Sequence, residues 1–169
     1  MMNKKHMLMM ISILIVSVLL VGCSSANNKV PQKTEGADAT IEIKDNSIVI
    51  ENSDISIKSS DKLQWPADKM APLPRPDAAV KTVMEYPDEK TMVVNIEFNK
   101  PESARDYIQQ VKNSGYIENS MDDKEDMLEF IGYNQDNSEV MINYLVMSNA
   151  GYITLKRDSN AVKEYFANK

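Results

Sequence analysis

The feature that most limits the fold of this chain is an alternation of apolar and polar side chains in two neighbouring segments, 80–86 and 92–98. Side chains two residues apart share one face of a β-strand but lie on opposite sides of a helix, so both segments are predicted to be strands. Residues 87–90 between them have the composition of a turn. The pattern predicts a β-hairpin with one apolar face. The side chains expected on that face are Val80, Thr82, Met84 and Tyr86, then Met92, Val94, Ile96 and Phe98.

A helical pattern follows this hairpin. Pro101 suits the first turn of a helix, and Gly115 suits the position just after its last turn. The apolar residues between them recur at the spacing of a single helix face. We therefore expect one main helix that packs on the sheet through this stripe. Its members are Ala104, Tyr107, Ile108 and Val111.

Three more strands and a short helix complete the predicted body. The strands are expected at 127–133, 139–147 and 152–157, and the helix at 161–168 after the capping residues 158–160. Residues 118–126 are predicted to be a polar loop. The order β-β-α-β-β-β-α gives an α+β fold, in which an antiparallel sheet carries one main helix on a face.

Residues 40–60 contain a short repeat with a period of seven. An Ile-x-Ile unit followed by four polar residues begins at Ile41, Ile48 and Ile55. Apolar residues two apart favour strands over a heptad coiled coil, and the Asp, Asn and Ser residues favour turns. We expect two or three short strands, and the sequence leaves open whether they join the main sheet. The Asp and Asn oxygens would also suit Ca²⁺, but turn chemistry is the simpler interpretation.

The N-terminus has the pattern of an export signal. Lys4 and Lys5 precede an uncharged apolar run at 7–21, which is shorter than the ~20 residues of a spanning helix. The run ends in Leu20-Val21-Gly22-Cys23, which resembles the lipobox of bacterial prolipoproteins at all four positions. The resemblance implies diacylglycerol on Cys23 and cleavage between Gly22 and Cys23. An ordinary export signal or an unmodified Cys is the alternative.

These features predict four parts in the chain. Residues 1–22 would be a lipoprotein signal peptide, 23–39 the lipidated Cys and a flexible tether, 40–60 the short β repeats, and 61–169 the α+β domain. Residues 24–39 are mostly small and polar, which is typical of a disordered linker. Two acyl chains are enough for stable anchoring. The expected location is therefore the cell membrane, with the body facing outside the cytoplasm.

Histidine and cysteine occur once each, and this excludes several classes of site. His6 lies in the predicted signal and Cys23 carries the predicted lipid, so the mature chain would keep no imidazole and no free thiol. The mature chain would then be unable to form four kinds of site: a Ser-His-Asp triad, a Cys-His catalytic pair, a zinc site of His and Cys ligands, and a disulfide. We predict no enzyme, no catalytic residue, no cofactor and no metal site. The formal net charge of −6 also disfavours nucleic acid as a partner.

Residues 65–76 form a proline-rich segment that holds the only tryptophan. Its prolines are expected to exclude a regular helix or a central strand, and they predict an extended, partly polyproline conformation. One hypothesis is an exposed recognition strip. The residues that would bind a partner are Trp65, Pro66, Pro72 and Pro74. The alternative, which we favour because an exposed Trp without a partner is unfavourable, is a strap that seals the core. Its buried anchors would be Trp65, Met70 and Leu73.

Four carboxylates gather within residues 122–126 of the predicted polar loop. Carboxylate oxygens are good ligands for hard cations, so this segment is the strongest candidate for a metal or a cationic ligand. Acidic runs of this kind are usually solvated surface loops, which is the alternative interpretation.

The order of motifs in the body supports a resemblance. Trp65-Pro66-x-Asp68 and Leu73-Pro74 are followed by the hairpin, by the helix ending in Gly115-Tyr116, and by an Asn-Asp turn between strands. In this order the motifs are similar to a group of small extracytoplasmic lipoproteins of low-GC Gram-positive bacteria. The likeness extends over residues 40–169 and implies the same location, but no activity and no catalytic residues. The prolines at 72, 74 and 76 depart from the single proline expected before the hairpin.

Together these observations predict a membrane-anchored extracytoplasmic binding or interaction module. Its contact surface would be the proline-rich segment and the exposed face of the sheet. Its partners would be the membrane, through diacylglycerol on Cys23, and an envelope protein or a wall component. Two other hypotheses stay open, an accessory or structural subunit of an envelope complex and a glycan hydrolase using a carboxylate pair. The ligand, the biological process and the oligomeric state are not specified by the sequence.

Overall fold

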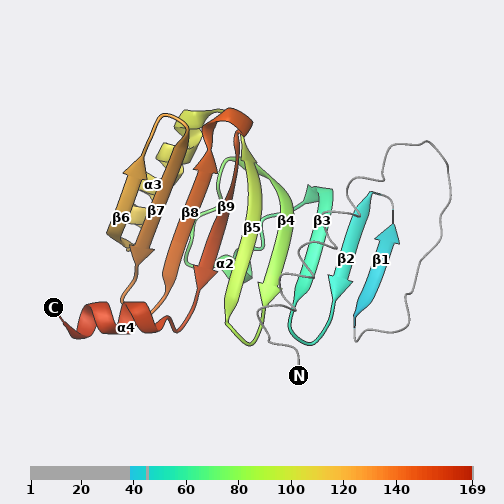
Figure 1. The fold of residues 1–169 in the computed structure, drawn as a ribbon, viewed down its shortest axis with the longest axis horizontal. Coiled ribbons are helices and arrows are strands. Elements are labelled where there is room, and N and C mark those ends of the chain that lie inside the picture. Colours follow the sequence, from blue (N-terminus) through green and yellow to red (C-terminus); the bar gives the residue numbers. More distant parts are fainter. Residues whose placement is uncertain (1–38, 45, 169) are drawn as a thin grey trace, which may run out of the picture. The chain divides into compact units, whose positions relative to one another are not determined.

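A computed structural model of the protein describes residues 39–44 and 46–168. They form one nine-stranded sheet in the order β1-β2-β3-β4-β5-β9-β8-β7-β6, with every neighbouring pair antiparallel (Figure 1). The strands are β1 (Thr40–Lys44), β2 (Ser47–Glu51), β3 (Ser56–Leu63), β4 (Ala78–Tyr86), β5 (Thr91–Phe98), β6 (Ile117–Asp123), β7 (Met127–Tyr133), β8 (Glu139–Leu145) and β9 (Ala150–Lys156). The helices are α2 (Ala67–Met70), α3 (Pro101–Asn113) and α4 (Asn160–Ala167), with a 3-10 turn, η1 (Val146–Ser148). The α+β class with an antiparallel sheet is confirmed.

Two runs of consecutive strands build the sheet and meet at one seam. Strands β1 to β5 follow one another from one edge, and β6 to β9 return from the opposite edge, so that β5 pairs with β9. Helix α3 connects β5 at the seam to β6 at the far edge. It lies on one face of this half of the sheet, behind β6 and β7 in Figure 1. We call the opposite face of these strands, away from α3, the open face.

Helix α3 packs through the stripe that the sequence predicts, and all four of its members are buried. It begins at Pro101 and ends at Asn113, and Gly115, just after the C-cap residue Ser114, has a φ of 104°. The Gly115 N–H donates to the Lys112 carbonyl at 3.1 Å, and the Tyr116 N–H donates to the Val111 carbonyl at 3.4 Å. These two bonds are the Schellman arrangement, which a glycine permits because it tolerates positive φ.

The proline-rich segment covers the same face as α3 and acts as a strap. Its three expected anchors, Trp65, Met70 and Leu73, are all buried in the hydrophobic core. The Tyr107 hydroxyl of α3 donates to the Pro74 carbonyl at 3.0 Å. Their burial and this bond match the core-sealing alternative.

One expectation for this strap is wrong, because it contains the short helix α2. The prolines flank this helix and do not interrupt it, with Pro66 at its N-cap position and the cis Ala71-Pro72 bond just after it. The Arg157 guanidinium donates to the carbonyls of Lys69 and Ala71 at 3.0 and 2.8 Å, and so satisfies two carbonyls at the end of the helix.

The seven-residue repeat forms three strands, and these join the main sheet. Ile41 lies opposite Ile50, Ile50 opposite Ile57, and Ile57 opposite Met84 of β4. Strand β3 runs from residue 56 to 63, across the division expected at 60/61. The side-chain oxygen of Asn52 accepts the N–H groups of Asp54 and Ile55, both at 2.8 Å. These bonds stabilise a turn, which agrees with the interpretation of the Asp and Asn residues as turn formers.

The expected polar loop at 118–126 is wrong. Residues 117–123 form the edge strand β6, and only the short turn 124–126 separates it from β7. The body therefore has the order β-β-α-β-β-β-β-α. A polar edge strand presents charges to solvent on both faces, which discourages pairing with other chains, and it lacks the apolar alternation of an inner strand.

The first strand of the predicted hairpin changes face at a β-bulge. The register between β4 and β5 shifts between Val80 and Thr82, so the extra residue is Lys81. Beyond the bulge Val83 packs against the core, whereas Thr82, Met84 and Tyr86 lie on the open face. Strict alternation therefore predicts the wrong face for the residues of β4 that follow the bulge.

Helix α4 begins after Ser159, but this residue does not cap it with its side chain. The Ser159 hydroxyl donates to Glu139 of β8 at 2.6 Å. The ring of Tyr165 meets that of Tyr133 edge-on at 5.2 Å, so α4 packs against one end of the open face. In the described part of the chain, no helix is long and apolar enough to cross a membrane.

Candidate functional site

The residues predicted for lipidation and cleavage, Gly22 and Cys23, lie outside the described residues. The export signal, the lipid anchor and the tether stay predictions. The first described residue, Ala39, leads directly into the edge strand β1.

The predicted recognition strip does not present its tryptophan to solvent. Trp65 is only 7% exposed, and its indole is part of the core. Pro66 and Pro74 are half-buried, while Pro72 is exposed. No single exposed surface is therefore formed by the four predicted binding residues, Trp65, Pro66, Pro72 and Pro74. Binding through them stays a prediction.

The acidic segment is divided between the two faces of the sheet. Asp122 lies opposite Glu129 and pairs with Lys124 at 2.5 Å. Asp123 lies on the covered face, where both of its oxygens accept hydrogen bonds from Arg105. Successive residues of a strand point to opposite faces, so these carboxylates cannot converge on one ion. Among residues 39–44 and 46–168, no group of three or more His, Cys, Asp or Glu side chains is placed to hold a metal.

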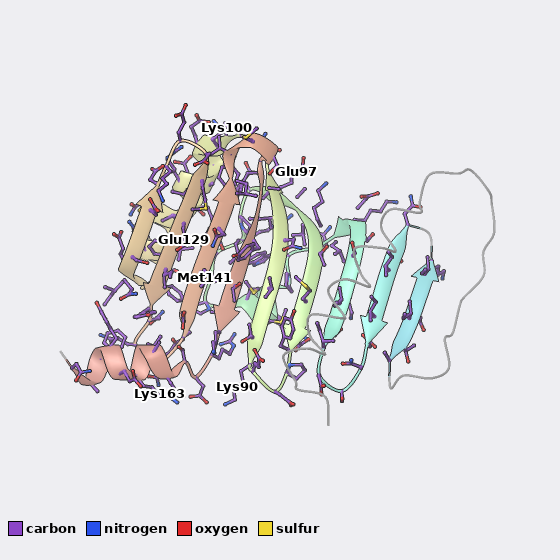
Figure 2. All side chains as sticks on the ribbon, viewed as in Figure 1. Lys90, Glu97, Lys100, Glu129, Met141 and Lys163 are labelled. Atoms are coloured by element: carbon purple, nitrogen blue, oxygen red, sulfur yellow. The ribbon has the colours of Figure 1, made fainter. Side chains whose placement is uncertain are left out.

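The open face carries two parallel rows of side chains that the strand registers bring together. One row is largely aliphatic, and the other is largely polar. The aliphatic row contains Ile41, Ile50, Ile57, Met84, Val93, Thr154, Met141 and Ile131. The polar row contains Ser59, Thr82, Asn95, Tyr152, Asn143, Glu129 and Asp122. Met141 and Glu129, from the two rows, are labelled in Figure 2 on β8 and β7.

A groove of about 580 Å³ lies on the open face across β4, β5, β9 and β8. Its lining includes Asn95, Asn143 and Tyr152 of the polar row, together with Leu145. Lys81 and Glu97 also line it, and Glu97 is labelled in Figure 2 near the end of β5. The β4 bulge matters here, because beyond Lys81 it places Thr82, Met84 and Tyr86 on the open face, while Val83 packs against the core.

Tyr152 lines this groove and is 38% exposed. It lies directly opposite Asn95 on one side and Asn143 on the other. The neighbouring Gly151 lets β9 approach β8 closely, because a Cβ there would lie 2.2 Å from the Asn143 carbonyl oxygen.

The charged groups of the groove are already paired. Lys81 Nζ lies 2.8 Å from Glu97 Oε2, and the hydrogen bond and negative charge of Glu97 raise the pKa of Lys81. The Asn143 amide donates to Glu129 Oε2 at 3.2 Å, beyond the groove lining. The groove thus offers a ligand one aromatic ring and two side-chain amides. Its two charged residues, Lys81 and Glu97, neutralise each other.

A second, smaller groove of about 330 Å³ lies beside α2. Its charged lining is engaged within the chain, since Lys69 pairs with Glu85 and Arg157 donates to the strap carbonyls. These contacts hold the strap in place, so the groove on the open face is the stronger candidate.

Sequence reasoning placed the contact surface partly on the exposed sheet face but did not name the groove residues. Asn95, Asn143 and Tyr152 come from three strands, and nothing near any of them in the sequence marks a site. They meet only through the β5–β9 seam and the β8–β9 pair. The single feature of the sequence that could have indicated this site is an aromatic residue at a solvent-facing position of a strand, and that residue is Tyr152.

Comparisons of this chain with protein-family models, with curated proteins and with solved structures give no match.

Proposed function

We propose that this chain is a binding module displayed outside the cytoplasm and anchored to the membrane by a lipid on Cys23, with the open-face groove as its contact surface. The observation that carries the proposal is the asymmetry of the sheet. One face is covered by α3 and the strap, whereas the other presents a groove lined by an exposed tyrosine, Tyr152. Grooves with an aromatic surface and a few converging polar groups are the usual form of a ligand site.

The groove chemistry supports binding over glycan hydrolysis. A hydrolase of the carboxylate type needs two acidic side chains that flank the bond to be broken. Glu97 is the single carboxylate among the residues that line the groove, and it is held in an ion pair with Lys81. This arrangement supplies neither a second acid nor a carboxyl group free of a cation.

The experiment is crosslinking in cells followed by affinity capture of the full-length, membrane-anchored protein. A specific envelope protein or wall fragment should be recovered with the wild-type chain and reduced with Tyr152→Ala. The Met147→Ala variant is the matched control, since Met147 is 94% exposed and does not line the groove. The Cys23→Ser variant should leave the membrane fraction. Equal recovery with wild type and Tyr152→Ala would overturn the groove as the contact surface, and membrane retention of Cys23→Ser would overturn the lipid anchor.

A further inference from the structure

We infer that the open-face groove takes an uncharged, hydroxyl-rich ligand, a neutral oligosaccharide of two or more pyranose rings. This inference rests on the proposed function, because it names the ligand class of the same groove. It is carried by the side chains that line the groove and by the charge balance of that lining.

The two asparagines supply the hydrogen-bonding pattern that sugar hydroxyls need. Each side-chain amide carries two N–H donors and one carbonyl acceptor, and each hydroxyl of a sugar is both a donor and an acceptor. Asn95 and Asn143 lie on either side of Tyr152, in register on three adjacent strands. Strands lie ~4.8 Å apart, so the two amides are separated by ~10 Å, about the length of two pyranose rings.

The tyrosine supplies the apolar part of the contact. A pyranose ring presents a face of C–H bonds, which packs on the negative face of an aromatic ring. Tyr152 lines the groove and is partly exposed, so the free part of its ring can be covered by a ligand. Buried aromatic surface contributes strongly to binding at such sites.

The charge balance disfavours an ionic ligand. Lys81 and Glu97 are the charged residues of the lining, and they form an ion pair at 2.8 Å. An anion would have to displace Glu97 from Lys81, and a cation would have to displace Lys81 from Glu97. A neutral ligand leaves the pair intact and loses no Coulomb energy, so it is the ligand class that fits the groove best.

The volume and openness of the groove agree with an oligomer. Its volume of about 580 Å³ falls within the ~300–1,000 Å³ range of small-molecule sites. It crosses four strands on the open face, so a sugar chain can extend beyond either end of it.

The test is isothermal titration calorimetry with the full-length protein in a detergent that has no sugar headgroup. The probes are chitohexaose and cellohexaose, which are neutral, and the hexamer of chitosan, which has the chitohexaose backbone but carries positive charges. We expect at least one neutral hexasaccharide to bind. Tyr152→Ala should weaken that binding about tenfold or more, whereas Tyr152→Phe, which keeps the ring, should change it less than threefold. Asn143→Ala should also weaken it, and Met147→Ala should leave it unchanged.

The outcomes separate this inference from the proposed function. Binding of the charged hexamer alone would overturn the neutral class but keep the groove as a ligand site. No saccharide binding, together with capture of an envelope protein that depends on Tyr152, would overturn the saccharide inference and retain the binding module. Failure of both the saccharide titration and the Tyr152-dependent capture would overturn both. Circular dichroism spectra of each variant, matched to wild type, exclude misfolding as the cause of lost binding.

Discussion

Arg105 and Asp123 form a two-point ion pair that ties α3 to the edge strand β6. Arg105 Nη2 lies 2.6 Å from Asp123 Oδ1, and Arg105 Nε lies 3.0 Å from Asp123 Oδ2. The edge strand has one neighbouring strand only, so this pair adds a second attachment on the covered face. The hydrogen bonds and charge of Arg105 lower the pKa of Asp123. Two parallel bonds of this kind fix the geometry better than one lysine contact would.

The first prediction concerns acid. Because the folded-state pKa of Asp123 is lowered, its contribution to stability is present above the ordinary carboxyl pKa of ~3.9 and disappears as the pH falls through the folded-state value. Asp123→Asn should therefore be less stable than wild type at neutral pH and equal to it in strong acid. Urea denaturation at a series of pH values measures this. Glu125→Gln, which changes an exposed carboxylate in the turn after β6, is the matched control. A constant difference at every pH would contradict the ion-pair explanation.

A second prediction tests the strap. Trp65→Ala should lower the free energy of unfolding by ~3–5 kcal/mol, the usual cost of truncating a large buried aromatic residue. Arg75→Ala, which changes an exposed residue of the same segment, should stay within ~0.5 kcal/mol of wild type. Chemical denaturation gives both values. If Trp65→Ala folds as stably as Arg75→Ala but no longer captures a partner, the recognition strip would be correct and the strap wrong.

A third prediction tests the bulge at Lys81. Val83 packs against the core and Thr82 lies on the open face. Val83→Asp should therefore destabilise the protein by ~2–3 kcal/mol, since it places a carboxylate at the edge of the core, while Thr82→Asp should be tolerated. Thermal melting of the two variants compares them directly. Strict alternation from residue 80 to 86 would give the reverse order of stabilities.

A fourth prediction concerns alkaline pH. Burial raises the pKa of Tyr107, Tyr116 and Tyr144 above the ordinary value of ~10. Below pH ~10 these three tyrosines are neutral in both the folded and the unfolded chain, so their full contribution to stability is present. As the pH rises above it, the unfolded chain loses these protons more readily than the folded one, and stability falls. Tyrosinate absorbance and circular dichroism should therefore change together above pH ~10.

The variant for this prediction is Tyr107→Phe. It should make the loss of stability with rising pH shallower. At neutral pH it should cost ~1–2 kcal/mol, because the Pro74 carbonyl loses its donor. Tyr152→Phe, which changes an exposed hydroxyl, serves as the control. Full ionisation of all tyrosines before any loss of structure would contradict the prediction.

The fifth prediction concerns Gly151. A Cβ at this position would lie 2.2 Å from the Asn143 carbonyl oxygen and 3.0 Å from Tyr144 Cα. Gly151→Ala should therefore push β9 away from β8, and lower the free energy of unfolding by ~2 kcal/mol or more. Hydrogen exchange should show weaker protection of the β8–β9 amides than in wild type. An unchanged exchange pattern would contradict the prediction, because it would show that the added Cβ is accommodated without separating β8 from β9.

Local patterns in the sequence predict most of the regular elements. The stripe from Ala104 to Val111, with Pro101 before it and Gly115 after it, specifies α3 because each signal lies within one helix. The strands with strong apolar alternation, such as β5 with Met92 to Phe98, are also predicted correctly. These elements need no knowledge of distant residues.

The elements that were missed depend on partners elsewhere in the chain. Strand β6 is mostly polar and its two large apolar residues, Ile117 and Met121, do not alternate, so it forms because β7 offers a free edge and Arg105 offers a charge. The bulge at Lys81 is visible only in the pairing with β5. The groove is non-local for the same reason, since Asn95 meets Tyr152 through the seam that joins the two halves of the sheet. No periodicity in one segment encodes such a pairing.

The three strands formed by the repeat also set a distance. The described chain enters the sheet at β1, and five strand spacings separate β1 from β9, which carries Tyr152. At ~4.8 Å per spacing, the groove is held ~24 Å from the point of entry. In a chain anchored through Cys23, these strands would act as a stiff arm of constant length. The Ile-x-Ile repeat would then determine how far the groove stands from its attachment point, and each added or removed pair of strands would change this offset by ~10 Å.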